Sequence, residues 1–247
     1  MEETIILGLD RDGVMVENWL STPGGNYFTI SSDDIVLCKS TTEAFTYMSN
    51  HNIRVYILTN QAWIKNEEDI ELCKKVNYAL VEKIPMGDNI IEGFYVSNII
   101  SEHGERALAK AEKLRAIKEM WINHSCRFYM VGDSESDIAA GAIAGFSTIY
   151  IETIHGKPRE SIDCDYYAKD ILEAVKIAVN GFCIVKQKPI IPDREYKVSV
   201  SRGYTEIVTM AGPELVPPND YIIEHDDGSF SRMKRESMKG YYNVGIK

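Results

Sequence analysis

The sequence predicts an α/β fold: a Rossmann-like parallel sheet with helices on both faces, followed by a small, mainly β C-terminal domain. Between residues 5 and 179, short apolar runs alternate with longer segments that have helical periodicity. After residue 194 the pattern changes to period two, with turn signals between the runs. Alternating strands and helices are typical of βαβ units, in which consecutive strands lie parallel.

The expected strands of the parallel sheet are short apolar runs, which suit strands buried on both faces. They cover residues 5–9, 53–58, 94–96, 127–131, 148–151 and 166–168. The expected helices cover residues 41–50, 66–84, 105–121, a segment from about 136, and 170–179. Start and stop signals support them: Ser40 is an expected N-cap, acidic residues follow Asn66, and Gly181 follows the last helix.

A domain boundary is expected where two prolines, Pro189 and Pro192, disfavour regular structure. The charge balance changes at the same place. Residues 1–182 hold 17 basic and 28 acidic residues, whereas residues 183–247 hold 10 basic and 9 acidic residues. We therefore expect a first domain over residues 1–182, a linker over 183–193, and a small β-rich domain over 194–247.

The C-terminal segment contains strand candidates at residues 196–200 and 205–210, and a hairpin of 221–224 with 229–233 around a turn at 226–228. A short helical turn is expected at 235–239. Residues 218–230 resemble small β accessory modules of bacteriophage proteins. Such a module could cover an active site, mediate homo-oligomer formation or bind a partner; a packed appendage without chemistry is the simpler alternative.

Composition narrows the possible functions of the chain. A net charge of −10 argues against a general binder of nucleic-acid backbones, which usually has a basic surface. The five cysteines are odd in number and form no C-x-x-C pair, so we expect neither a disulfide framework nor a structural zinc site, and a reducing cytoplasm fits. The longest apolar run near the start is far below the roughly 18 residues of a membrane span.

Polar clusters follow three of the expected strands. Asp10 and Asp12 follow the first strand, Thr59 and Asn60 the second, and residues 132–137 the strand at 127–131. Because ligands of open parallel sheets bind beyond the carboxyl ends of the strands, we expect these clusters to converge. Carboxylates brought together repel one another, and a hard cation such as Mg²⁺ relieves that repulsion through oxygen ligands.

Three segments of the chain carry a resemblance. They are residues 9–14 (Leu-Asp-Arg-Asp-Gly-Val), 57–61 (Ile-Leu-Thr-Asn-Gln) and 131–137, which begin with Val-Gly-Asp. They resemble the motifs of the haloacid dehalogenase (HAD) superfamily of phosphatases. The resemblance covers about residues 4–182. The Asp-Arg-Asp-Gly and Thr-Asn-Gln forms are most similar to the histidinol-phosphate and heptose-bisphosphate phosphatase branch. The resemblance implies a HAD-like fold and a Mg²⁺-dependent phosphatase.

The resemblance also implies roles for four aspartates. Asp10 would be the nucleophile that forms an aspartyl-phosphate. Asp12 would protonate the leaving oxygen and then activate the water that cleaves the intermediate. Asp10, the backbone carbonyl of Asp12 and Asp133 would hold Mg²⁺, with Asp137 in the second shell of the metal or bound to it through water.

The phosphate would be held by Thr59 and Asn60, and by a lysine that neutralises its charge. In this branch Pro and Gly commonly follow that lysine, but here Lys110 is followed by Ala-Glu-Lys-Leu without a helix breaker. Spacing back from Asp133 favours Lys110. Lys113 is the alternative, because a continuous helix could change which side chain faces the site.

Two further departures concern the metal and the lid. Heptose-bisphosphate phosphatases typically carry a Cys/His zinc loop, but between residues 94 and 110 this chain has His103 and no cysteine, which removes the zinc prediction and questions a heptose substrate. Neither the 46 residues between Asp12 and Thr59 nor the 50 between Thr59 and Lys110 have room for a large cap domain. The site is therefore open, or closed by the loop at 21–27, by the C-terminal segment or by a partner chain.

The function expected from these patterns is hydrolysis of a small phosphomonoester, either a sugar phosphate or a nucleotide. Two alternatives stay open. One is a phosphatase for nucleic-acid ends or a signalling nucleotide, which an open site and the phage-like tail favour and the acidic composition opposes. The other is a protein that binds a phosphorylated metabolite without turnover, which the irregular lysine segment favours.

Overall fold

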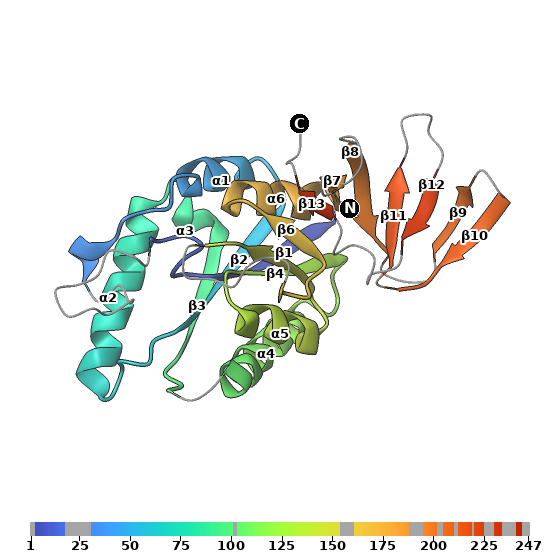
Figure 1. The fold of residues 1–247 in the computed structure, drawn as a ribbon. Helices are drawn as coiled ribbons and strands as arrows, with labels where there is room; N and C mark the ends of the chain where they lie inside the picture. The colour runs from blue at the N-terminus through green and yellow to red at the C-terminus, as the bar shows by residue number, and fades with distance from the viewer. Residues whose placement is uncertain are drawn as a thin grey trace.

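The computed structural model describes residues 3–17, 31–100, 103–153, 161–187, 195–201, 205–209, 212–218, 220–224, 230–233 and 241–243. Figure 1 shows a sheet with helices on either side, followed by a group of C-terminal strands. None of the described helices has the length and apolarity that crossing a membrane would need.

The first part of the chain forms a six-stranded parallel sheet in the order β3-β2-β1-β4-β5-β6. The strands are β1 (Thr4–Asp10), β2 (Ile53–Asn60), β3 (Ile91–Ser97), β4 (Cys126–Gly132), β5 (Ser147–Ile151) and β6 (Tyr166–Ala168). The predicted Rossmann-like, HAD-like fold class is therefore confirmed. Strand order reverses between β1 and β4, because the chain runs outward from β1 to β3 and then returns to the other side of β1.

The helices are α1 (Thr41–Met48), α2 (Glu67–Lys83), α3 (Gly87–Ile90), α4 (His103–Met120), α5 (Glu135–Ala144) and α6 (Ile171–Asn180), with a 3₁₀ turn η1 (Ser32–Asp34). The sequence did not predict η1 and α3, which are too short to carry a periodic signal. Asn66 caps α2 through the backbone N–H of Asp69, and Gly181 ends α6 with a left-handed backbone. Ser40 precedes α1 as expected, but its side chain makes no capping hydrogen bond.

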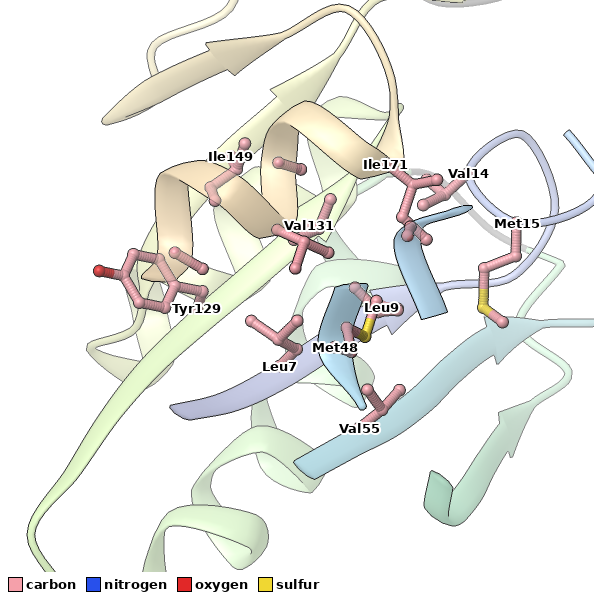
Figure 2. Close-up of a cluster of buried hydrophobic side chains, with 14 of the residues drawn as sticks. Leu7, Leu9, Val14, Met15, Met48, Val55, Tyr129, Val131, Ile149 and Ile171 are labelled. Atoms are coloured by element: carbon pink, nitrogen blue, oxygen red, sulfur yellow. The ribbon is translucent and has the colours of Figure 1, made fainter. Parts of the chain in front are cut away.

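Two apolar layers cover the faces of the parallel sheet. Leu7 and Leu9 of β1 belong to the layer beneath α1, α2 and α6. Ile6 belongs to the opposite layer, beneath α4 and α5. Figure 2 shows the first layer, with Leu7 and Leu9 beside Val131 of β4. Successive side chains of a strand point to opposite faces of the sheet. The apolar residues of β1 therefore pack into both layers.

The C-terminal strands form a five-stranded sheet in the order β12-β11-β8-β7-β13 and a separate β9–β10 hairpin, with antiparallel pairing throughout. They are β7 (Phe182–Gln187), β8 (Glu195–Val200), β9 (Thr205–Thr209), β10 (Gly212–Val216), β11 (Tyr221–Glu224), β12 (Phe230–Met233) and β13 (Tyr241–Asn243). Strands occupy the segments expected near 196–200 and 205–210, and β11 pairs with β12 as expected. β10 was not predicted.

The linker expected at residues 183–193 begins inside a strand, since β7 extends to Gln187 and pairs with β8 and β13. The two prolines that indicated a break come after that strand. Residues 188–193, the turn at 226–228 and the expected helical turn at 235–239 lie outside the described residues. The division into two domains stays a prediction.

Tyr221 of β11 joins the C-terminal strands to the parallel sheet. Its side chain is buried in the same apolar cluster as Leu7 and α6. Its hydroxyl donates to the carbonyl oxygen of Asp165 at 2.8 Å. Asp165 directly precedes β6, so this contact lies at the amino ends of the parallel strands, opposite to the edge where polar clusters follow the strands.

We expect Tyr221→Phe to lower the free energy of unfolding by about 1 kcal/mol, because a buried hydrogen bond is lost. Tyr221→Ala, which also opens a cavity, should cost about 3–5 kcal/mol. Denaturant unfolding at equilibrium measures both. Tyr78→Phe is the matched control, since Tyr78 is 68% exposed, and it should change stability by less than about 0.5 kcal/mol. Equal losses of stability in Tyr221→Phe and Tyr78→Phe would contradict the packing of Tyr221 in the core of the parallel sheet.

Candidate active site

Three buried carboxylates meet at the carboxyl edge of the sheet, where strand order reverses. Asp10 is the last residue of β1, Asp133 directly follows β4, and Asp137 lies in the first turn of α5. One carboxylate oxygen from each lies within 4.8 Å of the other two. These neighbours arise because β1 and β4 pair in parallel, with Leu9 opposite Val131. We call Asp10, Asp133 and Asp137 the acidic cluster.

The N-terminus of α5 fixes the position of Asp137. The hydroxyl of Ser134 accepts from the backbone N–H of Asp137, and one oxygen of Asp137 accepts from the backbone N–H and the hydroxyl of Ser134, at 3.2 and 2.6 Å. Gly132 makes this packing possible, because a Cβ there would lie 2.2 Å from the Cβ of Asp137. Position 132 therefore requires glycine, because Asp137 packs too close for any side chain there.

Lys110 of α4 reaches into the acidic cluster. Its Nζ donates to Asp10 at 2.7 Å and to the other oxygen of Asp137. Lys110 is 5% exposed, whereas Lys113 on the same helix is exposed. The packing of α4 determines which lysine faces the site. Ala111 and Leu114 pack against the sheet, and this orientation places Lys110 at the sheet edge.

The electrostatics of the acidic cluster favour binding of a cation. Burial, followed by the nearby carboxylates of Asp137 and Asp133, raises the pKa of Asp10 well above its ordinary value. Burial, with Asp137 next in importance, raises the pKa of Asp133 to about 7. For Lys110, burial lowers the pKa, but Asp10 and Asp137 outweigh it and leave that pKa above its ordinary value. One ammonium group thus faces three carboxylates.

Asp12 lies apart from the acidic cluster, because a different set of donors holds its carboxylate. Its Oδ2 accepts from Nε and Nη2 of Arg11 at 3.1 and 2.8 Å. The same oxygen accepts from Gln61 at 2.7 Å and from the Thr59 hydroxyl at 3.4 Å. Nη1 of Arg11 donates to Asn77 of α2 at 2.8 Å. Asp10 and Asp12 are thus two residues apart but have different partners.

The two polar residues that end β2 have different surroundings. Thr59 is buried and accepts from Gln61 at 2.6 Å, so its hydroxyl belongs to the network around Asp12. The Asn60 carboxamide instead holds the loop after β3: it donates to the carbonyl oxygen of Ile99 and accepts from Ser97, both at 2.9 Å. The Asn60 carboxamide thus holds this loop, and its contact with a phosphoryl group stays a prediction.

The sequence analysis assigned no role to Arg11, Gln61, Asn77 or Thr153. Arg11 and Gln61 stand inside the two motifs that carry the resemblance, where they could have been found. Asn77 is a polar residue on the apolar stripe of α2, a pattern that indicates a buried hydrogen-bonding partner. Thr153 closely follows β5 and donates to Asp133 at 3.0 Å, so the strand-end rule would have indicated it.

A cavity of about 390 Å³ has Gly13, Cys38, Lys39, Thr153 and Lys169 among its lining residues. No member of the acidic cluster lines it, but Thr153 links it to the cluster by its hydrogen bond to Asp133. Cys38 is close enough that Asp133 and Asp12 add to the effects of burial and Glu17, which together raise its pKa to about 12. A larger groove of about 780 Å³ lies between α2 and β3 and contains no member of the cluster. The loop at 21–27, one candidate for a lid, lies outside the described residues.

Comparison with known proteins agrees with this geometry. Residues 105–174, which include Lys110, Asp133 and Asp137, match the family model described as HAD-hydrolase-like. This segment of the chain is therefore similar to HAD-like hydrolases. The sequence matches none of the curated proteins.

Solved structures similar to this chain include two D,D-heptose 1,7-bisphosphate phosphatases. The protein from B. bronchiseptica, complexed with magnesium and phosphate, is 16% identical, with a TM-score of 0.53 over 72% of this chain and 98% of its own. The protein from Burkholderia thailandensis is 18% identical, with a TM-score of 0.43 over 72% and 97%. At these identities the likeness to the first structure establishes the fold alone.

We expect Gly132→Ala to disrupt the acidic cluster, because its new methyl group would collide with Asp137. The free energy of unfolding should fall by about 1–3 kcal/mol, and turnover should fall with it. Gly104→Ala is the matched control on α4, since a Cβ there meets no atom within 4 Å. That change should be neutral or stabilise by up to about 1 kcal/mol. Equilibrium unfolding and activity assays on both variants test this, and an unimpaired Gly132→Ala protein would contradict it.

Proposed function

We propose that the chain is a Mg²⁺-dependent phosphatase that hydrolyses a small phosphomonoester, a sugar phosphate or a nucleotide, through an aspartyl-phosphate on Asp10. The observation that carries the proposal is the contact of buried Lys110 with Asp10 and Asp137 at the sheet edge where strand order reverses. A buried lysine beside a carboxylate nucleophile suits an anionic substrate, whose charge it offsets.

The residues of the acidic cluster fit a divalent cation. Three buried carboxylates against one lysine leave excess negative charge, and hard cations prefer oxygen ligands. Asp10, Asp133 and the backbone carbonyl of Asp12 would hold Mg²⁺. Asp137 would not bind the ion directly, because its oxygens already accept from Lys110 and Ser134. When bound, the ion supplies positive charge beside the phosphoryl oxygens.

The proposed reaction has two displacements at phosphorus. In the first, a carboxylate oxygen of Asp10 attacks, the ester P–O bond breaks, and Asp12 gives its proton to the leaving oxygen. In the second, water attacks the phosphorus of the aspartyl-phosphate, Asp12 takes its proton, and orthophosphate and Asp10 are released. Lys110 holds the attacking carboxylate, and the Thr59 hydroxyl would turn its one hydrogen from Asp12 to a phosphoryl oxygen when substrate binds.

The cavity lined by Thr153, which donates to Asp133, supports a small substrate. At about 390 Å³ it lies within the usual range for pockets that take small molecules. Its lining carries both lysines and carboxylates, which differs from the basic groove typical of nucleic-acid binding. A phosphatase for nucleic-acid ends or a signalling nucleotide is therefore the second candidate function. Binding of a phosphorylated metabolite without turnover is the third.

Asp10→Asn should lower phosphate release by at least about 1000-fold, because the amide is a poor nucleophile. The measurement is orthophosphate release with Mg²⁺ from a panel of sugar phosphates, nucleotides and end-phosphorylated oligonucleotides. Lys113→Met is the matched control for Lys110→Met: the first should keep activity and the second should lose it. Equal activity of wild type and Asp10→Asn would remove Asp10 as the nucleophile, and binding without any release would favour the third candidate.

Mg²⁺ should stabilise the protein more at about pH 8 than at about pH 5.5. The pKa of Asp133 is about 7, so at low pH a proton competes with the metal. Without metal, the folded state holds this proton more tightly than the unfolded state does, so this group's contribution to stability is largest below about pH 4 and is lost as pH rises through 7. Thermal unfolding with MgCl₂ against EDTA, at both pH values, measures the difference.

The control is Asp133→Asn, whose Mg²⁺-dependent shift in Tm should be small at both pH values. An equal shift in the wild-type protein at the two pH values would contradict the assignment of Asp133 as a metal ligand with a raised pKa.

A further inference from the structure

Arg11 is a charged side chain that the proposed reaction does not use, yet it is fully buried, with 0% exposure. Removing a guanidinium from water is costly unless its donors are satisfied. Here Nε and Nη2 both donate to Asp12, and Nη1 donates to Asn77. A planar fork of this kind fixes a direction as well as a charge.

Several donors hold Oδ2 of the Asp12 carboxylate. Arg11, Gln61 and Thr59 supply four hydrogen bonds, and all four converge on Oδ2. Gln61 is itself held, because its carbonyl oxygen accepts from Trp63 at 2.7 Å. The orientation of the carboxylate thus depends on the side chains that surround Oδ2.

Asn77 anchors the arrangement to the body of the domain. Asn77 is 4% exposed on α2, between Val76 and Leu80, whose side chains belong to the main apolar cluster. Arg11 therefore connects Asp12, on the loop after β1, to a helix held by the core. A lysine at position 11 would keep the charge, but it has a single nitrogen and cannot reproduce this fork.

We propose that Arg11 is a positioning residue: anchored by Asn77, it sets the direction of the Asp12 carboxylate, and it affects the reaction through Asp12. This rests on the proposed function. Proton transfer requires the donor to be held close to its productive geometry, and a residue that supplies this support changes turnover more than substrate binding.

A double-mutant cycle tests the proposal, with p-nitrophenyl phosphate and Mg²⁺ as the probe. Arg11→Met should lower kcat at least about 10-fold with KM within about 2-fold, and Arg11→Lys should retain an intermediate kcat. In the Asp12→Asn background, Arg11→Met should change the residual kcat by less than about 2-fold, because its target is gone. An equal loss in both backgrounds, or a loss expressed in KM alone, would overturn the proposal.

A second pair of variants separates positioning from folding. Asn77→Ala removes the anchor and should lower kcat by about 3- to 10-fold. Val76→Ala is its matched control, since Val76 is buried on the same helix and its side chain belongs to the apolar cluster, and it should lower Tm but leave kcat within about 2-fold. If Arg11→Met does not fold, Asn77→Ala and Arg11→Lys carry the test. Equal kcat losses in the two α2 variants would overturn the proposal.

The outcomes also separate this proposal from the proposed function. A wild-type protein that releases no phosphate, or an Asp12→Asn protein as active as wild type, would overturn both. An active wild type, an impaired Asp12→Asn protein and additive losses would overturn the role of Arg11 alone.

Discussion

The mutual repulsion of three buried carboxylates is the constraint on which the rest of the site depends. Asp10, Asp133 and Asp137 approach within 4.8 Å of one another where solvent cannot screen them. Such an arrangement persists only on rigid supports with a compensating charge. The parallel pairing of β1 with β4 supplies the support, the capped N-terminus of α5 holds Asp137, and α4 delivers the ammonium group of Lys110.

The same constraint explains why Asp10 and Asp12 have separate partners. A fourth carboxylate in the cluster would add repulsion without adding a cation. Asp12 is instead neutralised by Arg11, so the site consists of two ion-pair systems that join at the end of β1. Different surroundings would let these two aspartates take the different roles proposed for them, one as nucleophile and one as acid and base.

The sequence predicts those parts of the site that depend on local pattern. Apolar runs locate the strand ends, and parallel pairing then brings Asp10 and Asp133 together. The choice between Lys110 and Lys113 depends on the rotation of α4, which Leu114 and Ile117 set by packing on the sheet. The partner of Arg11 lies 66 residues away on α2, beyond the reach of any local pattern.

The C-terminal sheet does not close the active site through the contacts that attach it. Tyr221 bonds to Asp165, and the carboxylate of Asp165 accepts from the backbone N–H of Thr148 near the start of β5. The acidic cluster lies past the carboxyl ends of the strands, and the five residues of β5 alone span about 16 Å. An element fixed at the amino edge is better suited to stabilising the sheet or presenting a surface for another chain. The contacts of Tyr221 therefore argue against the C-terminal strands as a lid.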